Sequence, residues 1–450
     1  MNKKKWALLF LFGALVFGYV KLFYKTYNED TVAKSADCII TLDVKRITTT
    51  LIWNFITTPS QWKVGNIFKS GGKKEISWKD MVEIEDYIFA FHVNNQPANV
   101  WYVLLKIKNE NDFTKGLLQY NFKKLNSNLY LSNNLGIQFL KNGNKILVTN
   151  YTTENNSYLA LVADEIFIKK SYSSKESLKK TIDANSHLTV YLAANKFLQH
   201  DGIITGNFDK NKIEINCSLT QNTLYNFTEN NFSYSANSLF TLGFTQPSAA
   251  VYGLFSDSSK NKVSKAISIN IDSLIRHDNK YYSIELTGIE PRIDSAITYA
   301  YDDDFNKVEK VVVNNVLEPA YNFNIAGDSV TNIYNYFLNN KKLEQTDTGQ
   351  LFTAMPFVKS YCNIKGETLL NITAANYFAQ PANKNINCIL FLNLLLTKIP
   401  ASLLKYLPND LIKATANIES IHLLANKKNE QLIINCLLQK KKNDLPIIKF

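Results

Sequence analysis

Hydrophobic and polar positions alternate along most of the chain in short β-type runs, separated by stretches with helical spacing. Residues 36–44 (ADCIITLDV) form an apolar, β-branched run that predicts a buried strand, and helical spacing follows it as far as Ile56. Residues 86–93 and 100–107 predict a hairpin, because two apolar runs flank the turn sequence NNQPA. Further strands are predicted around residues 187–193, 213–219 and 281–286. The pattern indicates an α+β protein built of mainly antiparallel sheet with helices packed on it.

A strand that leads into a helical stretch recurs along the sequence. It is found at residues 38–56, 188–198, 321–337 and 389–404. The second and fourth occurrences are followed by hairpin patterns that end in the same tripeptide, Ile215-Asn216-Cys217 and Ile434-Asn435-Cys436. We therefore predict two related units; the alternative is that a chain rich in Ile and Asn repeats tripeptides by chance.

The predicted domains are an N-terminal segment and these two units. They are residues 1–25, residues 26–185, and a larger unit of residues 186–450 that repeats the first.

The N-terminal segment has the pattern of a transmembrane helix. An unbroken apolar or Gly run from Trp6 to Val20 is followed by Lys21, and the 19 residues from Trp6 to Tyr24 are enough to cross roughly 30 Å of hydrocarbon. The residues predicted to anchor the chain in the membrane are Trp6, Leu8, Phe10, Leu15, Phe17 and Tyr24. A cleaved signal peptide is the alternative, although no small-x-small site directly follows the run.

Charge gives this helix an orientation. Lysines at positions 3–5 precede the apolar run, which predicts a cytoplasmic N-terminus. The chain is then a single-pass inner-membrane protein, with the bulk of its residues periplasmic. The formal net charge is +11, but the only arginines are Arg46, Arg276 and Arg292. Because arginine is the usual residue for bidentate phosphate and base contacts, nucleic acid is not an expected partner.

The layout as a whole resembles that of uncharacterised, singly anchored envelope proteins of Gram-negative bacteria. The resemblance lies in the short Lys cluster, the one anchor, the ADCIITLDV strand and the later ITYAYDDDFNKVEK hairpin. It implies an envelope location and a modular α+β form, and it brings no functional residues with it.

The five cysteines show no C-x-x-C spacing, which argues against a zinc ribbon or a thioredoxin-like site. Most lie in apolar strand patterns, where a free cysteine acts as a small hydrophobic residue. Cys388 with Cys436 is the pair we would test first for a disulfide.

One acidic cluster could hold a metal ion. Asp302, Asp304 and Asn306 match the first ligand positions of a calcium loop, but Lys307 replaces the required Gly and Val313 stands where the final Glu belongs. The alternative is a polar turn between residues 296–301 and 308–313. We expect the turn.

Neither a catalytic motif nor a cofactor motif emerges from the sequence. The five histidines are scattered, and G-x-S-x-G, P-loop and G-x-G-x-x-G patterns do not occur. We therefore expect no cofactor and a non-enzymatic protein that binds or scaffolds a protein, a lipid or an envelope component. An apolar-ligand carrier is a narrower version of this expectation and would require a large cavity. The alternative is an envelope hydrolase whose site is assembled from distant residues.

Overall fold

The computed structural model describes residues 24–58, 76–151, 157–220, 227–253, 255–275, 279–301, 305–328, 330–354, 358–379, 384–399, 417–429 and 431–441. The chain divides into two compact units, and the division falls between Thr220 and Gln221. Unit 1 therefore includes residues 186–220, which the sequence analysis assigned to the second unit.

Unit 1 is an antiparallel sheet with short helices. Its strands are β1 (Ala36–Asp43), β2 (Val82–Glu83), β3 (Tyr87–Val93), β4 (Tyr102–Ile107), β5 (Lys123–Lys124), β6 (Leu129–Ser132), β7 (Ile137–Asn142), β8 (Lys145–Thr149), β9 (Leu188–Leu192), β10 (Gly202–Phe208) and β11 (Lys212–Thr220). Its helices are α2 (Val44–Thr57), α3 (Trp78–Met81), α4 (Glu110–Gln119), α5 (Ser157–Ala163) with a π-helical continuation (Asp164–Ile168), and α6 (Lys175–Asp183).

The core of unit 1 lies between the sheet and the α5–α6 segment. Phe91 and Tyr102 from the sheet pack in one cluster with Leu159 and Ile166 from the helical segment. The side chain of Asp43 begins α2 by accepting a hydrogen bond from the backbone N–H of Arg46 at 2.8 Å. Burial of these aromatic and aliphatic side chains is the main stabilising contribution to the unit.

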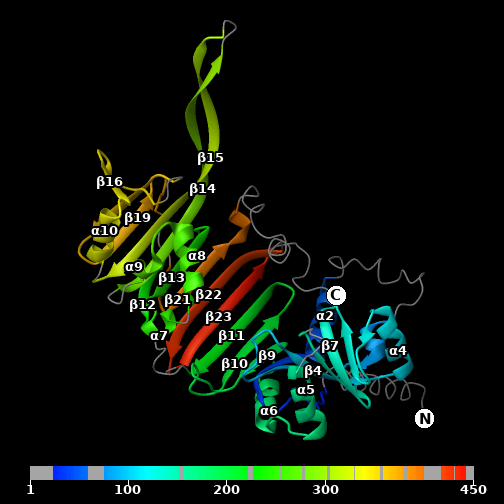
Figure 1. Cartoon of the computed structure of the whole chain (residues 1–450). Coiled ribbons are helices and arrows are strands. Elements are labelled where there is room, and N and C mark those ends of the chain that lie inside the picture. Colours follow the sequence, from blue (N-terminus) through cyan, green and yellow to red (C-terminus); the bar gives the residue numbers. More distant parts are fainter. Residues whose placement is uncertain are drawn as a thin grey trace, which may run out of the picture. The chain divides into compact units, whose positions relative to one another are not determined.

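Unit 2 is a second antiparallel sheet, coloured from green through yellow to red in Figure 1, where the green strands β10 and β11 still belong to unit 1. Its strands are β13 (Phe240–Thr245), β14 (Asn279–Tyr301), β15 (Lys307–Gly327), β16 (Leu343–Thr346), β17 (Gly349–Phe352), β18 (Ser360–Lys365), β19 (Leu369–Ala374), β21 (Leu390–Leu395), β22 (Ile418–Lys428) and β23 (Gln431–Lys440). Its helices are α7 (Ala249–Tyr252), α8 (Asp257–Ile267), α9 (Ile271–Leu274), α10 (Val330–Asn339) and a 3-10 turn (Leu396–Lys398).

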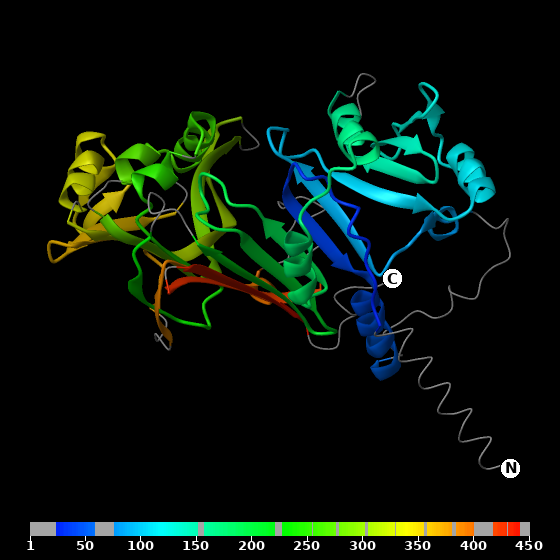
Figure 2. The same cartoon turned by 90° about the horizontal axis from the view of Figure 1, so that it is seen from below.

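The two faces of the unit 2 sheet carry different layers. Helices α7 to α10 lie on one face (Figure 2), where Phe337 of α10 packs with Ile325 and Leu370 in the main core. A separate two-stranded sheet of β12 (Asn230–Tyr234) and β20 (Lys384–Cys388) brings Phe232 against Phe391 of β21. The cavity described below lies between these helices and the sheet face that they cover.

Both units place their strands in the same spatial order. In unit 1 the order is β11, β10, β9, β1, β3, β4, β8, β7, β6, β5. In unit 2 it is β23, β22, β21, β13, β14, β15, β19, β18, β17, β16. In each unit the sheet strand that comes first in the sequence (β1 or β13) lies in the middle of this order. The hairpin that comes last in the sequence (β10–β11 or β22–β23) forms one end of the order.

The structure corrects the predicted α+β class. Strands account for 47% of the structure and helices for 23%, so the protein consists mostly of large antiparallel sheet. Residues 193–198, which were expected to be helical, form no helix after β9. Strands β14 and β15 are 23 and 21 residues long, much longer than the runs recognised in the sequence.

The predicted single-pass membrane protein is also corrected. In the part of the chain that the structure describes, no helix combines the length and the apolarity needed to cross a bilayer. The predicted anchor residues Trp6, Leu8, Phe10, Leu15 and Phe17 lie outside that part, and Tyr24 is exposed. The inner-membrane placement that was built on this helix is therefore withdrawn.

Candidate functional site: an apolar cavity in unit 2

One row of side chains across four strands forms the floor of the cavity. Phe244 of β13 is the register partner of Leu390 of β21, which pairs in turn with Ala425 of β22. Ala425 pairs with Ile434 of β23, and Leu432 lies on the same face two residues before Ile434. Because side chains alternate across a strand, these apolar residues form one continuous face of the sheet.

Three short helices form the opposite wall, and each begins at a polar cap. The Ser248, Ser256 and Asn270 side chains accept hydrogen bonds from backbone N–H groups in the first turns of α7, α8 and α9, respectively. The helices present apolar side chains to the cavity, among them Val263 and Ile271.

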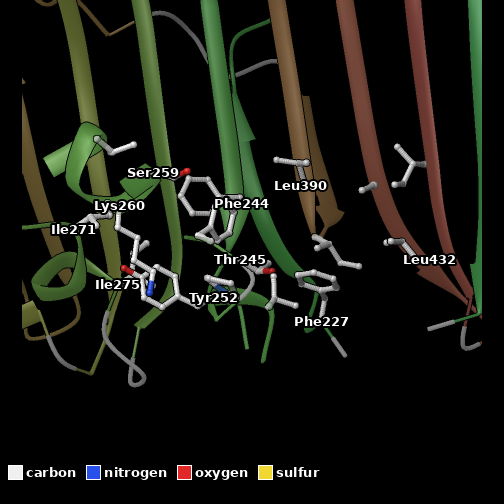
Figure 3. A pocket seen from close by; sticks show the side chains of 17 residues that line it. Phe227, Phe244, Thr245, Tyr252, Ser259, Lys260, Ile271, Ile275, Leu390 and Leu432 are labelled. Carbon is white, nitrogen blue, oxygen red and sulfur yellow. The ribbon is translucent and has the colours of Figure 1, made fainter. Parts of the chain in front are cut away.

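The cavity has a volume of about 510 Å³. Its lining residues are Phe227, Phe244, Thr245, Pro247, Val251, Tyr252, Phe255, Ser259, Lys260, Val263, Ile271, Ile275, Ile389, Leu390, Ala425, Leu432 and Ile434. Figure 3 shows these side chains gathered between the strands and the helices. An apolar lining with a few polar groups is the usual composition of a small-molecule site.

Lys260 is the charged residue in this lining. Its Nζ atom lies 4.3 Å from the ring centroid of Tyr252 and 4.0 Å from Oδ1 of Asp272 (Figure 3 shows the amine beside the ring). The Tyr252 hydroxyl donates a hydrogen bond to the same Asp272 oxygen. Burial, followed by this hydrogen bond, raises the pKa of Tyr252 well above its usual range, so the phenol stays neutral.

Thr245 borders the cavity, but its side chain points to the other face of the sheet, because it follows Phe244 in β13 and pairs with Tyr281, whose ring packs against Phe232. The residue is 3% exposed, and its Oγ1 atom has no hydrogen-bond partner among the described residues. Its backbone N–H is satisfied by the carbonyl of Ile389 at 2.8 Å, so only the hydroxyl lacks a partner. A buried hydroxyl without a partner costs about 1–3 kcal/mol.

The cysteines singled out from the sequence are not among the residues that line the cavity. All five are free thiols, with Cys388 on β20 and Cys436 on β23. Burial raises the pKa of Cys388 to about 12, which keeps its thiol protonated and unreactive.

The three residues that match a calcium loop, where a polar turn was expected, can be placed only in part. Asp302 and Asp304 lie outside the described residues, and Asn306 is exposed beside β15. Within the described ranges no three His, Cys, Asp or Glu side chains gather closely enough to hold a metal ion. Strands β14 and β15 pair on either side of this segment, for example Ala296 with Val312.

One histidine forms a pair that sequence reasoning missed. The Ser420 Oγ and His422 Nε2 atoms of β22 lie 2.9 Å apart. The Ser420 hydroxyl also donates to Oε1 of Gln439 at 3.1 Å, and burial lowers the pKa of His422. Strand alternation places both residues on the face opposite Ala425, so they do not line the cavity.

Sequence reasoning also missed the cavity itself, because no helices were predicted between residues 249 and 275. A usable signal was present: Val251, Phe255 and Val263 recur at helical intervals and alternate with polar residues. The spacing alone could not show that the opposite wall comes from strands near residues 390 and 430.

Comparison with known proteins identifies no family. No protein-family model matches the chain, and no curated protein matches its sequence. One similar solved structure is described as "Structure of crystal form III of TP0453". It has 7% sequence identity and a TM-score of 0.28, and the match covers 54% of this chain and 87% of that one.

Proposed function

We propose that this chain is a non-enzymatic binding protein and that its second unit takes up an apolar small molecule. The cavity beneath α7, α8 and α9 carries the proposal. Its volume of about 510 Å³ falls within the range of roughly 300–1,000 Å³ that is typical of ligand sites. This is the large apolar cavity that the carrier version of the expected function requires.

Physical chemistry favours an apolar occupant. Water in such a cavity would find few hydrogen-bonding partners, since Phe, Ile, Leu and Val side chains dominate the lining. A ligand that buries apolar surface there gains roughly 25 cal/mol for each Å² removed from water. Filling the cavity also supplies the dispersion contacts that an empty space lacks.

The test is binding of a polarity-sensitive naphthalene sulfonate dye to the full chain. Val263 on α8 lines the cavity and is 46% exposed, so Val263→Trp can place an indole at the opening without disturbing a sealed core. We expect this variant to weaken dye binding by about tenfold or more, because the indole occupies ligand space.

Val311→Trp is the matched control. Val311 lies on β15, is 61% exposed and does not line the cavity, so the same exchange there should leave dye affinity unchanged. Equal affinities for wild type and Val263→Trp, or an equal loss in both variants, would argue against the cavity as the binding site.

A hydrolase is the second candidate, and the Ser420–His422 hydrogen bond favours it. A serine beside a neutral imidazole is the core of a nucleophilic site. Ser420 is only 2% exposed, however, and its hydroxyl is shared with Gln439. Labelling by a fluorophosphonate in wild type, lost in Ser420→Ala, would support this candidate, and the absence of labelling would remove it.

A further inference from the structure

We propose that the arm of unit 2, residues 289–319 of the β14–β15 hairpin, joins two copies of this chain by pairing β15 of one copy with β15 of the other. The two copies then share one sheet in the order β14, β15, β15, β14, related by a twofold axis. The inference goes beyond the proposed function, because no residue of the arm lines the unit 2 cavity.

The outer edge of β15 is open along the arm. Strand β14 pairs with one side of β15 over its whole length, whereas β19 pairs with the other side only from Asn322 to Ala326 (Figure 1). Among the described residues, no strand pairs with the outer side of residues 307–321. Backbone N–H and C=O groups on such an edge are a template for a further strand, and a two-stranded ribbon in water gains stability from one.

The two edges of the arm differ in sequence, and only the β15 edge suits pairing with an identical chain. Residues 308–316 read VEKVVVNNV, with five valines, no proline, no glycine and one charge of each sign. High β-propensity without net charge favours pairing between identical segments. The corresponding part of β14 contains Pro291 and the charged Glu290, Arg292 and Asp294, and proline and charges discourage pairing at an edge.

The valines of this segment are still exposed to water. Val308, Val311 and Val313 are 40%, 61% and 60% exposed, and strand alternation puts Val308 on one face of the arm and the other two on the opposite face. A second β15 alongside would bring β-branched side chains next to one another on both faces. Cross-strand pairs of this kind stabilise a sheet.

Length and charge select one antiparallel register. A twofold axis at Val312 places residues 307–317 of one copy opposite residues 317–307 of the other. The added strand therefore ends before Asn322, where β19 takes over the edge. An axis at Glu309 or at Lys310 would instead bring two like charges directly opposite each other, which is destabilising.

Disulfide cross-linking of the full chain tests this register. Val312→Cys should give a covalent dimer under mild oxidation, because antiparallel partners have Cα atoms about 4.5–5.5 Å apart, within the span of a disulfide. The wild type, with its five native cysteines, should stay monomeric on the same non-reducing gel.

Two matched variants test the position of the axis and the choice of edge. Val308→Cys lies on the same strand, four residues from the axis, so its two copies are on the order of 27 Å apart. Thr298→Cys lies on β14 opposite Lys310, so both β15 strands separate its two copies. Neither variant should cross-link, and a dimer as abundant as that of Val312→Cys from either one would overturn the inference.

Sedimentation velocity of the full chain measures the non-covalent dimer. We expect the wild type to dimerise as its concentration rises. Val312→Lys should raise the dissociation constant at least about fivefold, because it sets two like charges directly opposite each other. Thr298→Lys, an exposed exchange on β14, is the control and should leave the constant within about twofold.

A wild type that stays monomeric at every concentration would contradict the pairing of two copies. If, in addition, the wild type binds neutral phosphatidylcholine vesicles and Val312→Lys does not, the arm contacts a membrane and the second copy is wrong. Circular dichroism of each variant checks that the sheet is intact.

Discussion

Gly243 of β13 shows how closely one residue can be tied to the packing around it. A Cβ atom at this position would lie 2.2 Å from the Phe391 ring and 2.9 Å from the Phe232 ring. These two rings form the small cluster that fastens the β12–β20 sheet to the main sheet, with centroids 5.2 Å apart. The two rings therefore occupy the space that a side chain at position 243 would fill.

Replacing this glycine tests that account. Gly243→Ala should lower the free energy of unfolding by about 1–3 kcal/mol, because the added methyl group forces two rings from their positions. Gly206→Ala on β10 is the control: its nearest neighbour would be Leu188 Cβ at 3.6 Å, an ordinary contact. Urea unfolding of both variants measures the difference, and equal shifts in the midpoint would contradict the packing argument.

Residue patterns could predict some of the candidate site and not the rest. Apolar strand positions identified Cys388 and Cys436 as strand residues, since that judgement depends on local sequence alone. The cavity combines residues as far apart as Phe227 and Ile434, and nothing in the local sequence records that they meet. The Ser420–His422 pair was missed because i, i+2 neighbours carry no motif until the strand is known.

At the scale of elements, the hairpin of β14 and β15 is unusual. Strand β14 pairs with β13 only as far as Leu286, and β15 pairs with β19 only from Asn322. Beyond these points the two strands pair with each other and form an arm that extends past the rest of the sheet (Figure 1). Ile297 and Val311 are paired on this arm and are 62% and 61% exposed.

The arm should be dispensable for the stability of unit 2. Replacing residues 289–319 by an Asn-Gly turn joins Gly288 to Ala320, which are already register partners. We expect the melting temperature, measured by circular dichroism, to change by no more than about 2 °C, because none of the described side chains on the arm belongs to the main core.

A core variant calibrates this measurement. Leu370 is fully buried, so Leu370→Ala should cost about 2–5 kcal/mol and lower the melting temperature clearly. A loss as large as this in the arm deletion would show that the hairpin supports the fold after all.

The sequence predicted strands and helices correctly where one hydrophobic pattern ran without a break. It failed where a proline or a bulge interrupted that pattern. The run from Cys38 to Ile56 gave a strand and then a helix, as β1 and α2 show. Strand β14 carries a proline, Pro291, and two bulges, so its sequence looks like separate short pieces. The strand continues because β15 matches it residue for residue over most of its length.

At the scale of the whole molecule, the shared strand order agrees with the recurrence of strand and helix patterns in the sequence. Of the three Ile-Asn-Cys tripeptides in the sequence, two fall on β11 and β23, which occupy the same end position in the two orders, and the third lies on β20. We propose that both units descend from one ancestral unit by duplication. Among the described residues, only unit 2 carries a long arm.

The same strand order has a consequence for synthesis on the ribosome. In unit 1 the central strand β1 is synthesised first, but Leu42 pairs with Leu188, which is synthesised much later. In unit 2 Phe240 of β13 likewise pairs with Leu394. At about 5–20 residues per second, each central strand stays without one neighbour for on the order of ten seconds. During that interval a nascent strand with an open edge is available to chaperones or to the wrong neighbour, so faithful production of this protein depends on what shields β1 and β13 while translation proceeds.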